Sequence, residues 1–239
     1  MTSAIASTDL ISDFPRRSRV RIWYLFHLSL ANSVMQQKFP QMRSLLKVSS
    51  AIDFFTEQLG WLINWLVLLT VGVGFYNVMV RFVGRYLGVQ LSSNALNELQ
   101  WYLFSLVFLL GFPYILKHGE NVRVDFFYAH FTEKQRAIVD FWGTVLFLIP
   151  FCAIGIWVTL NPVLQSWGYQ PDGTWGTWEI SPDAQGLPRA PIKTMIPIGL
   201  LLLLIQSISQ GIKYLAVLLG YKQVAEQIQL ETSEHINPE

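Results

Sequence analysis

The chain has 239 residues, of which 52% are hydrophobic, 14% aromatic and only 14% charged. Soluble domains carry about 25% charged residues, so this composition excludes a disordered chain and argues against a soluble globular domain. The formal net charge is +1, which gives no overall attraction to nucleic acid, and the single cysteine, Cys152, excludes an internal disulfide.

The first segment, residues 1–57, is expected to lie in the cytoplasm and along the membrane surface. Within residues 42–59 the apolar side chains recur at helical spacing. The opposite face of this stretch carries Arg43, Lys47, Ser50 and Glu57. The pattern predicts an interfacial amphipathic helix that leads into a membrane span. Residues 22–35 are apolar but too few to span, and they predict a second interfacial or partner-docking helix, with a re-entrant segment as the alternative.

Four long stretches without charged residues follow. They are residues 59–80, 99–116, 141–170 and 194–212. Each is long enough to cross about 30 Å of hydrocarbon at about 1.5 Å per residue. The sequence therefore predicts an all-α membrane protein with four transmembrane helices and N-terminal interfacial amphipathic helices. The expected spans are about 59–80, 97–116, 138–164 and 193–219, within a membrane domain at 58–221 that a polar cytoplasmic tail follows at 222–239.

The basic residues predict the orientation of these spans. Most Lys and Arg residues fall in the N-terminal segment, in the loop between spans two and three, and after span four. Basic residues are enriched on the cytoplasmic side of membrane proteins. Both termini are therefore expected in the cytoplasm.

Sites for chemistry are missing from the expected spans. The four uncharged stretches within them hold no Asp, Glu, Lys, Arg or His, and the four histidines fall outside the spans, so a bundle that holds haem through axial histidines is nearly excluded. There is no HExxH motif and no P-loop. We therefore expect no catalytic, cofactor-binding or metal-binding residue and no enzyme activity. Four dissimilar spans also argue against a transporter that works alone.

Polar side chains in span four offer contacts instead. Gln206 and Gln210 are one helical turn apart and share a face with Ser209 and Lys213. Amides and hydroxyls of this kind form hydrogen bonds across helix interfaces in membranes. A helix contact is the favoured interpretation, and a substrate pathway is the alternative.

Three further features lie at the ends of the spans. Glu98 opens span two, where capping the helix or pairing with Arg81 or Arg85 is favoured over an ion pair with a neighbouring subunit. Arg123 and Asp125 are expected on one side of the second loop.

The third loop is long and rich in aromatic residues, and Pro171-Asp172-Gly173 predicts a tight turn or short hairpin in it. It carries Trp175, Trp178 and Arg189. Membrane anchoring and partner binding are equally favoured for this loop.

Two motifs resemble those of a known family. The sequence NELQWYL opens span two at Asn97, and KHGENVRVD occupies 117–125, with Asn121 where the family often has His. With four spans and both ends inside, these motifs resemble the small integral-membrane subunit, of DctQ type, of tripartite ATP-independent periplasmic (TRAP) transporters. The resemblance covers roughly residues 54–221.

The resemblance implies a division of labour in the bacterial inner membrane. A periplasmic binding protein (DctP-like) would deliver an organic acid or related solute to a large membrane subunit (DctM-like) that moves it in an elevator-like motion driven by an ion gradient. The small subunit would be a fixed scaffold in the lipid bilayer. The alternative is a tetraspan scaffold or assembly protein with no role in solute transport. The candidate partner-contact residues are Glu98, Arg123, Asp125, Trp175, Trp178, Arg189, Gln206 and Gln210.

Overall fold

The structure, a computed structural model, describes residues 40–89, 91, 93–119 and 130–221. By their internal contacts, residues 1–46 and 47–239 form two compact units. The described part of the first unit is the start of one helix, and the arrangement below is that of the second unit. The expected helix at 22–35 and the tail at 222–239 lie outside the described residues.

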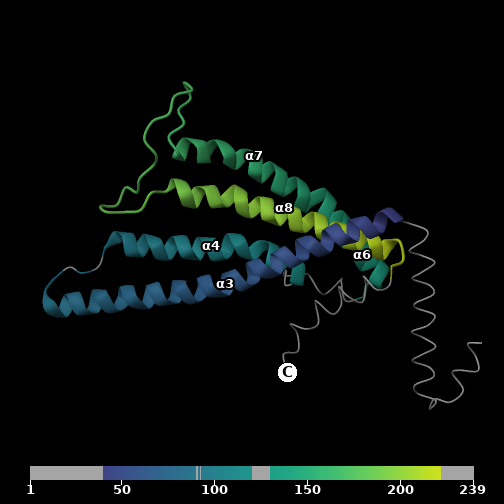
Figure 1. The fold of residues 1–239 in the computed structure, drawn as a ribbon, viewed down its shortest axis with the longest axis horizontal. Coiled ribbons are helices and arrows are strands. Elements are labelled where there is room, and N and C mark those ends of the chain that lie inside the picture. Colours follow the sequence, from purple (N-terminus) through teal and green to yellow (C-terminus); the bar gives the residue numbers. More distant parts are fainter. Residues whose placement is uncertain (1–39, 90, 92, 120–129, 222–239) are drawn as a thin grey trace, which may run out of the picture. The chain divides into compact units, whose positions relative to one another are not determined.

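The described chain is almost entirely helical (Figure 1). In chain order the helices are α3 (Pro40–Leu87), α4 (Asn94–His118), α6 (Glu133–Gly143), the π-helical turn η1 (Thr144–Leu148), α7 (Ile149–Ser166) and α8 (Ala190–Leu218). Extended pairing among these residues is limited to two isolated bridges in the loop before α8. Four helical segments are long and apolar enough to cross a membrane: Ser44–Leu87, Asn94–His118, Lys134–Ser166 and Ala190–Leu218. The prediction of an all-α protein with four such helices is confirmed.

Helix α3 is longer than the span expected within it. It runs for 48 residues without a break. The expected amphipathic stretch and the expected first span are therefore parts of one continuous helix. No glycine or proline interrupts residues 41–59, which explains why the backbone hydrogen-bond ladder continues across the expected junction.

The third membrane-capable segment contains a π-helical turn. Thr132 begins it with a capping box, in which its side chain accepts from the Gln135 backbone N–H and its own N–H donates to the Gln135 side chain at 2.9 Å. The backbone then widens at η1, just before Pro150. Proline has no N–H to donate, so the regular α-helical hydrogen-bond ladder is interrupted close to this wider turn.

Helix α8 is the centre of the bundle. It lies between α4 and α7, and it also contacts α6 (Figure 1). Its buried face includes Gly199, which packs against Leu109 of α4. A similar close approach joins α3 to α4, because a Cβ at Gly60 would lie 2.3 Å from the ring of Tyr114. At Gly60 the Tyr114 ring thus occupies the space that a side chain would need, whereas at Gly199 the near atoms include the Leu109 backbone carbonyl, so α8 and α4 approach each other closely there.

Candidate functional site

A buried cluster of polar side chains joins α3 to α8. We call it the polar seam, and it consists of Ser49, Asp53, Thr56, Gln206, Ser209 and Lys213. Asp53 is its centre: its Oδ1 accepts from Gln206 Nε2 and from Ser209 Oγ, each at 2.9 Å, and its Oδ2 lies 2.7 Å from Lys213 Nζ. The side chains of Asp53 and Lys213 are 13% and 7% exposed. This ion pair is therefore enclosed by protein and supported by further hydrogen bonds.

Hydroxyl groups complete the seam on both sides of Asp53. Thr56 Oγ1 donates to Gln206 Oε1 at 2.6 Å, so both ends of the Gln206 amide are bonded to α3. The hydroxyls of Ser49 and Ser209 lie 2.7 Å apart. Because these groups satisfy one another, the helices can bring polar surface together without leaving the amide of Gln206 unbonded in the interior.

Gln210 extends the contact from α8 to α4. Its Nε2 donates to the backbone carbonyls of Leu116 and Lys117, at 3.4 and 3.1 Å. These carbonyls belong to the last turn of α4, where helical N–H partners run out, although the Leu116 carbonyl also accepts from the Gly119 N–H at 3.3 Å. Lys117 also pairs with Glu57 of α3. Polar contacts thus join the C-terminal end of α4 to Glu57 within α3 and to Gln210 of α8.

Glu98 fastens the third loop to the start of α4. Its carboxylate accepts hydrogen bonds from the hydroxyl of Ser181 and from the backbone N–H of Leu187. Tyr102, one turn further along α4, donates to the Pro188 carbonyl at 3.3 Å. The two favoured expectations for Glu98 were a helix cap and a pair with Arg81 or Arg85. The bonds found here instead join it to a segment more than 80 residues away in the chain.

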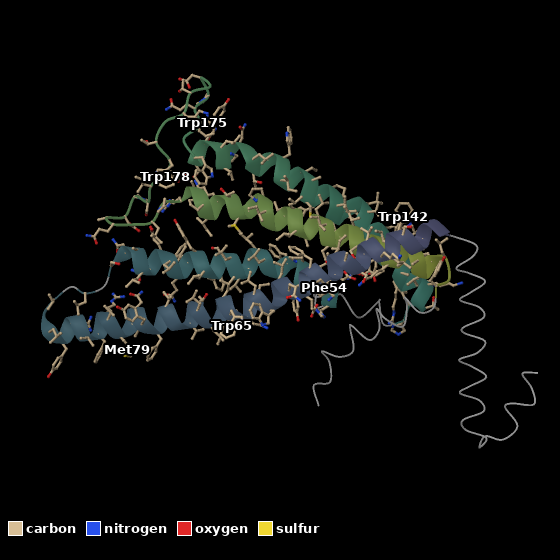
Figure 2. The ribbon with its side chains drawn as sticks, in the orientation of Figure 1. Phe54, Trp65, Met79, Trp142, Trp175 and Trp178 are labelled. Atoms are coloured by element: carbon tan, nitrogen blue, oxygen red, sulfur yellow. The ribbon has the colours of Figure 1, made fainter. Side chains whose placement is uncertain are left out.

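The third loop begins with a short hairpin that carries exposed aromatic side chains. Tyr169 and Trp175 form an antiparallel bridge across the turn at Pro171-Asp172-Gly173, as the sequence predicted. Gly168 has a φ of 97°, and a Cβ there would lie 2.6 Å from the Gly176 carbonyl oxygen, so the base of the hairpin requires glycine. Trp175 is 65% exposed and Trp178 is 47% exposed. Both lie on this loop in Figure 2.

A second set of polar contacts, centred on Glu179, holds the base of the hairpin to α7 and α8. Glu179 pairs with Lys193 of α8 and accepts from Ser166 Oγ, the last residue of α7, at 2.5 Å. The Lys193 ammonium and the Ser166 hydroxyl hold the pKa of Glu179 below its usual value, against a smaller effect of burial. The backbone N–H of Arg189 donates to the Glu179 carbonyl at 3.0 Å, which places Arg189 beside this group.

The structure thus brings the candidates together in two separate places. Glu98 and Arg189 belong to the loop side of the bundle with the two tryptophans, and Gln206 and Gln210 belong to the buried contacts with α3 and α4. Arg123 and Asp125 lie outside the described residues. Within the described ranges, no three His, Cys, Asp or Glu side chains gather where they could hold a metal ion.

Sequence reasoning missed two of these contacts. It placed Asp53 in the segment before span one and Lys213 on the polar face of span four, and it had no reason to pair them. The signal was present in part, because Lys213 follows Gln206 and Ser209 on the same face of α8. Ser181 and Glu179 gave no comparable signal, since loop pairing has no fixed period.

Comparison with protein families gives one match. A family model described as "Tripartite ATP-independent periplasmic transporters, DctQ component" matches residues 70–216. Searches of curated proteins and of solved structures each found no significant match. The matched region contains α4, α6, η1, α7 and most of α8, together with the later part of α3.

Proposed function

Because the chain belongs to the DctQ family, the small permease subunit of TRAP transporters, we propose that it is the scaffold on which a large membrane subunit moves its solute. The family model carries this proposal, since it covers more than half of the chain. The large subunit would be DctM-like, and a DctP-like periplasmic binding protein would supply the solute. The solute would be an organic acid or a related compound, taken up with an ion gradient.

The internal contacts of the chain support a scaffolding role. Gln206 and Ser209, the polar groups in the middle of α8, bond to α3, and Gln210 bonds to the end of α4. A transport site needs polar groups that a solute or ion can reach. Gln206 is completely buried, and these bonds use its amide within the chain. Movement of the solute would therefore fall to the partner subunit.

The loop between α7 and α8 is the proposed contact with the partners. Trp175, Trp178 and Arg189 are its candidate contact residues. Glu98, near the start of α4, would support the contact indirectly by holding residues 181–187 in place. Exposed tryptophan with arginine nearby is typical of protein interfaces. We place this loop on the periplasmic side of the inner membrane and both termini in the cytoplasm, in accord with the distribution of Lys and Arg.

Co-purification tests the proposal. The full chain is tagged at its C-terminus, expressed with its neighbouring genes, and extracted in a mild detergent. We expect a large multispanning membrane protein at near-equal amount, identified by mass spectrometry. Recovery of the chain alone would favour the alternative, a tetraspan scaffold or assembly protein without a role in transport.

Two variants test the loop itself. Trp178→Ala and Arg189→Glu should each lower uptake of the solute several-fold in cells, because hot-spot residues of these types often contribute about 2 kcal/mol or more to binding. The matched control is Trp157→Ala, which removes a 77% exposed tryptophan from α7 rather than from the loop. Protein level in the membrane is measured for each variant. Normal uptake in both loop variants, at normal protein level, would remove the docking role from this loop.

A further inference from the structure

The second half of the loop between α7 and α8 contains a tight turn with a strained backbone. The turn covers residues 183–186, and the Gly186 backbone N–H donates to the Asp183 carbonyl at 3.0 Å. Its third residue, Gln185, has a φ of 60°, in the left-handed region where such turns usually place glycine or asparagine. Among the described residues, Gln185 is the only one other than glycine with a positive φ. The turn therefore keeps a glutamine at this position at an energetic cost.

Side chains of α4 hold this turn in place. Asn94 Nδ2 donates to the Ala184 carbonyl at 3.1 Å, within the turn itself. Glu98 accepts from the Ser181 hydroxyl just before the turn and from the Leu187 backbone N–H just after it. The turn is thus attached at its centre and on both sides, so its strained backbone has little freedom to relax.

The outer surface of the turn is polar and exposed. Residues 182–185 are all exposed. Among the residues that the structure describes, the side chains of Asp183 and Gln185 have no hydrogen-bond partner. The Gln185 side chain therefore brings the fold no contact, although glycine would adopt the same backbone without strain. What the fixed turn does provide is one carboxylate and one amide that a second molecule can reach.

We propose that the turn at 183–186 is a contact site for a water-soluble protein, with Asp183 facing a basic side chain of that protein and the Gln185 amide hydrogen-bonded to it. This inference rests on the proposed function, in which the loop between α7 and α8 meets the partners. It assigns the turn to the soluble partner, the periplasmic binding protein, rather than to the large membrane subunit.

The composition of the turn separates the soluble partner from a membrane subunit. Permanent contacts between subunits are mainly apolar, and charged residues are depleted at their centres. Residues 182–185 are Pro, Asp, Ala and Gln, which include a charge and an amide but no large apolar side chain. A polar contact of this kind is typical of partners that bind and dissociate.

The fixed shape of the turn separates a protein partner from lipid headgroups. Headgroups are mobile and adapt to the surface they meet, so a rigid backbone adds nothing to their binding. Preorganisation strengthens binding to a partner whose own surface has a fixed shape. The negative charge of Asp183 also repels anionic headgroups, whereas a basic side chain of a protein complements it.

Binding of the soluble partner tests the proposal. The full chain, co-purified with whatever it retains, is immobilised in nanodiscs, and the secreted binding protein from the neighbouring genes is the probe in biolayer interferometry. Asp183→Asn should weaken binding several-fold and reduce its dependence on salt, because one charge pair is lost. The matched control is Asp172→Asn, which removes the same charge from the other turn of this loop and should leave binding within about twofold.

Gln185→Gly separates the side chain from the backbone. Glycine adopts this φ without strain, so the thermal unfolding midpoint should not fall, whereas binding should weaken several-fold because the amide is lost. A fall in both the midpoint and binding would give Gln185 a structural role and overturn the inference. Normal binding by Asp183→Asn or by Gln185→Gly would also overturn it and leave the proposed function intact. An unmodified chain that does not bind the probe would count against both.

Discussion

Asp53 and Lys213 form a buried ion pair within the contact between α3 and α8. A buried ion pair is not by itself a large source of stability, because both charges lose their hydration. Removing one member is costly, since it leaves the other charge without its partner in the interior. The pair is therefore better understood as a device that permits one relative placement of the two helices and penalises others.

This view predicts different effects for single and double variants. Asp53→Asn should destabilise the protein by about 3–5 kcal/mol, because Lys213 remains charged and buried. Combining Asp53→Leu with Lys213→Met should restore part of that loss, since no charge is then left unpaired. Thermal unfolding in detergent, followed by far-UV circular dichroism, measures both.

The control for this prediction is on the same helix. Glu57→Gln removes a carboxylate that is 46% exposed and paired with Lys117, and its effect should be below about 1 kcal/mol. Equal losses for Asp53→Asn and Glu57→Gln would show that burial does not distinguish the two pairs.

The conformation of the loop between α7 and α8 is maintained by the side-chain contacts of two glutamates. Glu98 holds its second half to α4, and Glu179 holds its first half to α7 and α8. These two attachments hold residues 179–187 in place, so they can present a fixed surface although they form no regular strand. Long loops that are fastened in this way are suited to binding.

The pKa of Glu179 predicts how this loop responds to acid. A carboxyl group whose pKa is lower in the folded than in the unfolded protein stabilises the fold above its unfolded pKa, and that contribution is lost as the pH falls through the folded value. The pKa of Glu179 lies below its usual 4.5, so its tether should persist at neutral pH and weaken only below about pH 4.5. Limited proteolysis of the loop between pH 6 and pH 3 measures this loss.

Two variants separate the tether from general acid effects. Glu179→Gln should be cleaved faster at neutral pH and should respond less to acid. Asp172→Asn is the control, because Asp172 bonds only within the hairpin turn, to Thr174. An unchanged acid response in Glu179→Gln would assign the sensitivity to another group.

The elements also show how far sequence reasoning reached. Uncharged stretches predicted all four membrane-capable helices, because a charged side chain in hydrocarbon is costly and membrane-crossing segments therefore contain few charged residues. The turn at Pro171-Asp172-Gly173 was predictable for a similarly local reason. The contacts of Asp53 and Glu98 were not, because each depends on a partner more than 80 residues distant whose position only the packed helices define.

For the whole molecule, the distribution of basic residues gives a prediction about orientation. Lys and Arg concentrate in the N-terminal segment, between the second and third membrane-capable helices, and after the fourth. Fusions of a periplasmic phosphatase after residue 175 should therefore be active, and fusions at the C-terminus inactive; a cytoplasmic fluorescent reporter should show the opposite. The reverse pattern would invert the proposed placement of the α7–α8 loop.

The π-helical turn at Thr144–Leu148 has a consequence for the molecule's tolerance of change. A π turn accommodates one residue more than the corresponding α-helical turn, and each residue rotates the following side chains by about 100°. Both α6 before it and α7 after it contact α8. The extra residue therefore sets the angular register between two contact faces of one helix. Loss of a single amino acid here would turn one face away from α8, whereas substitutions on either side can repack α6 and α7 independently.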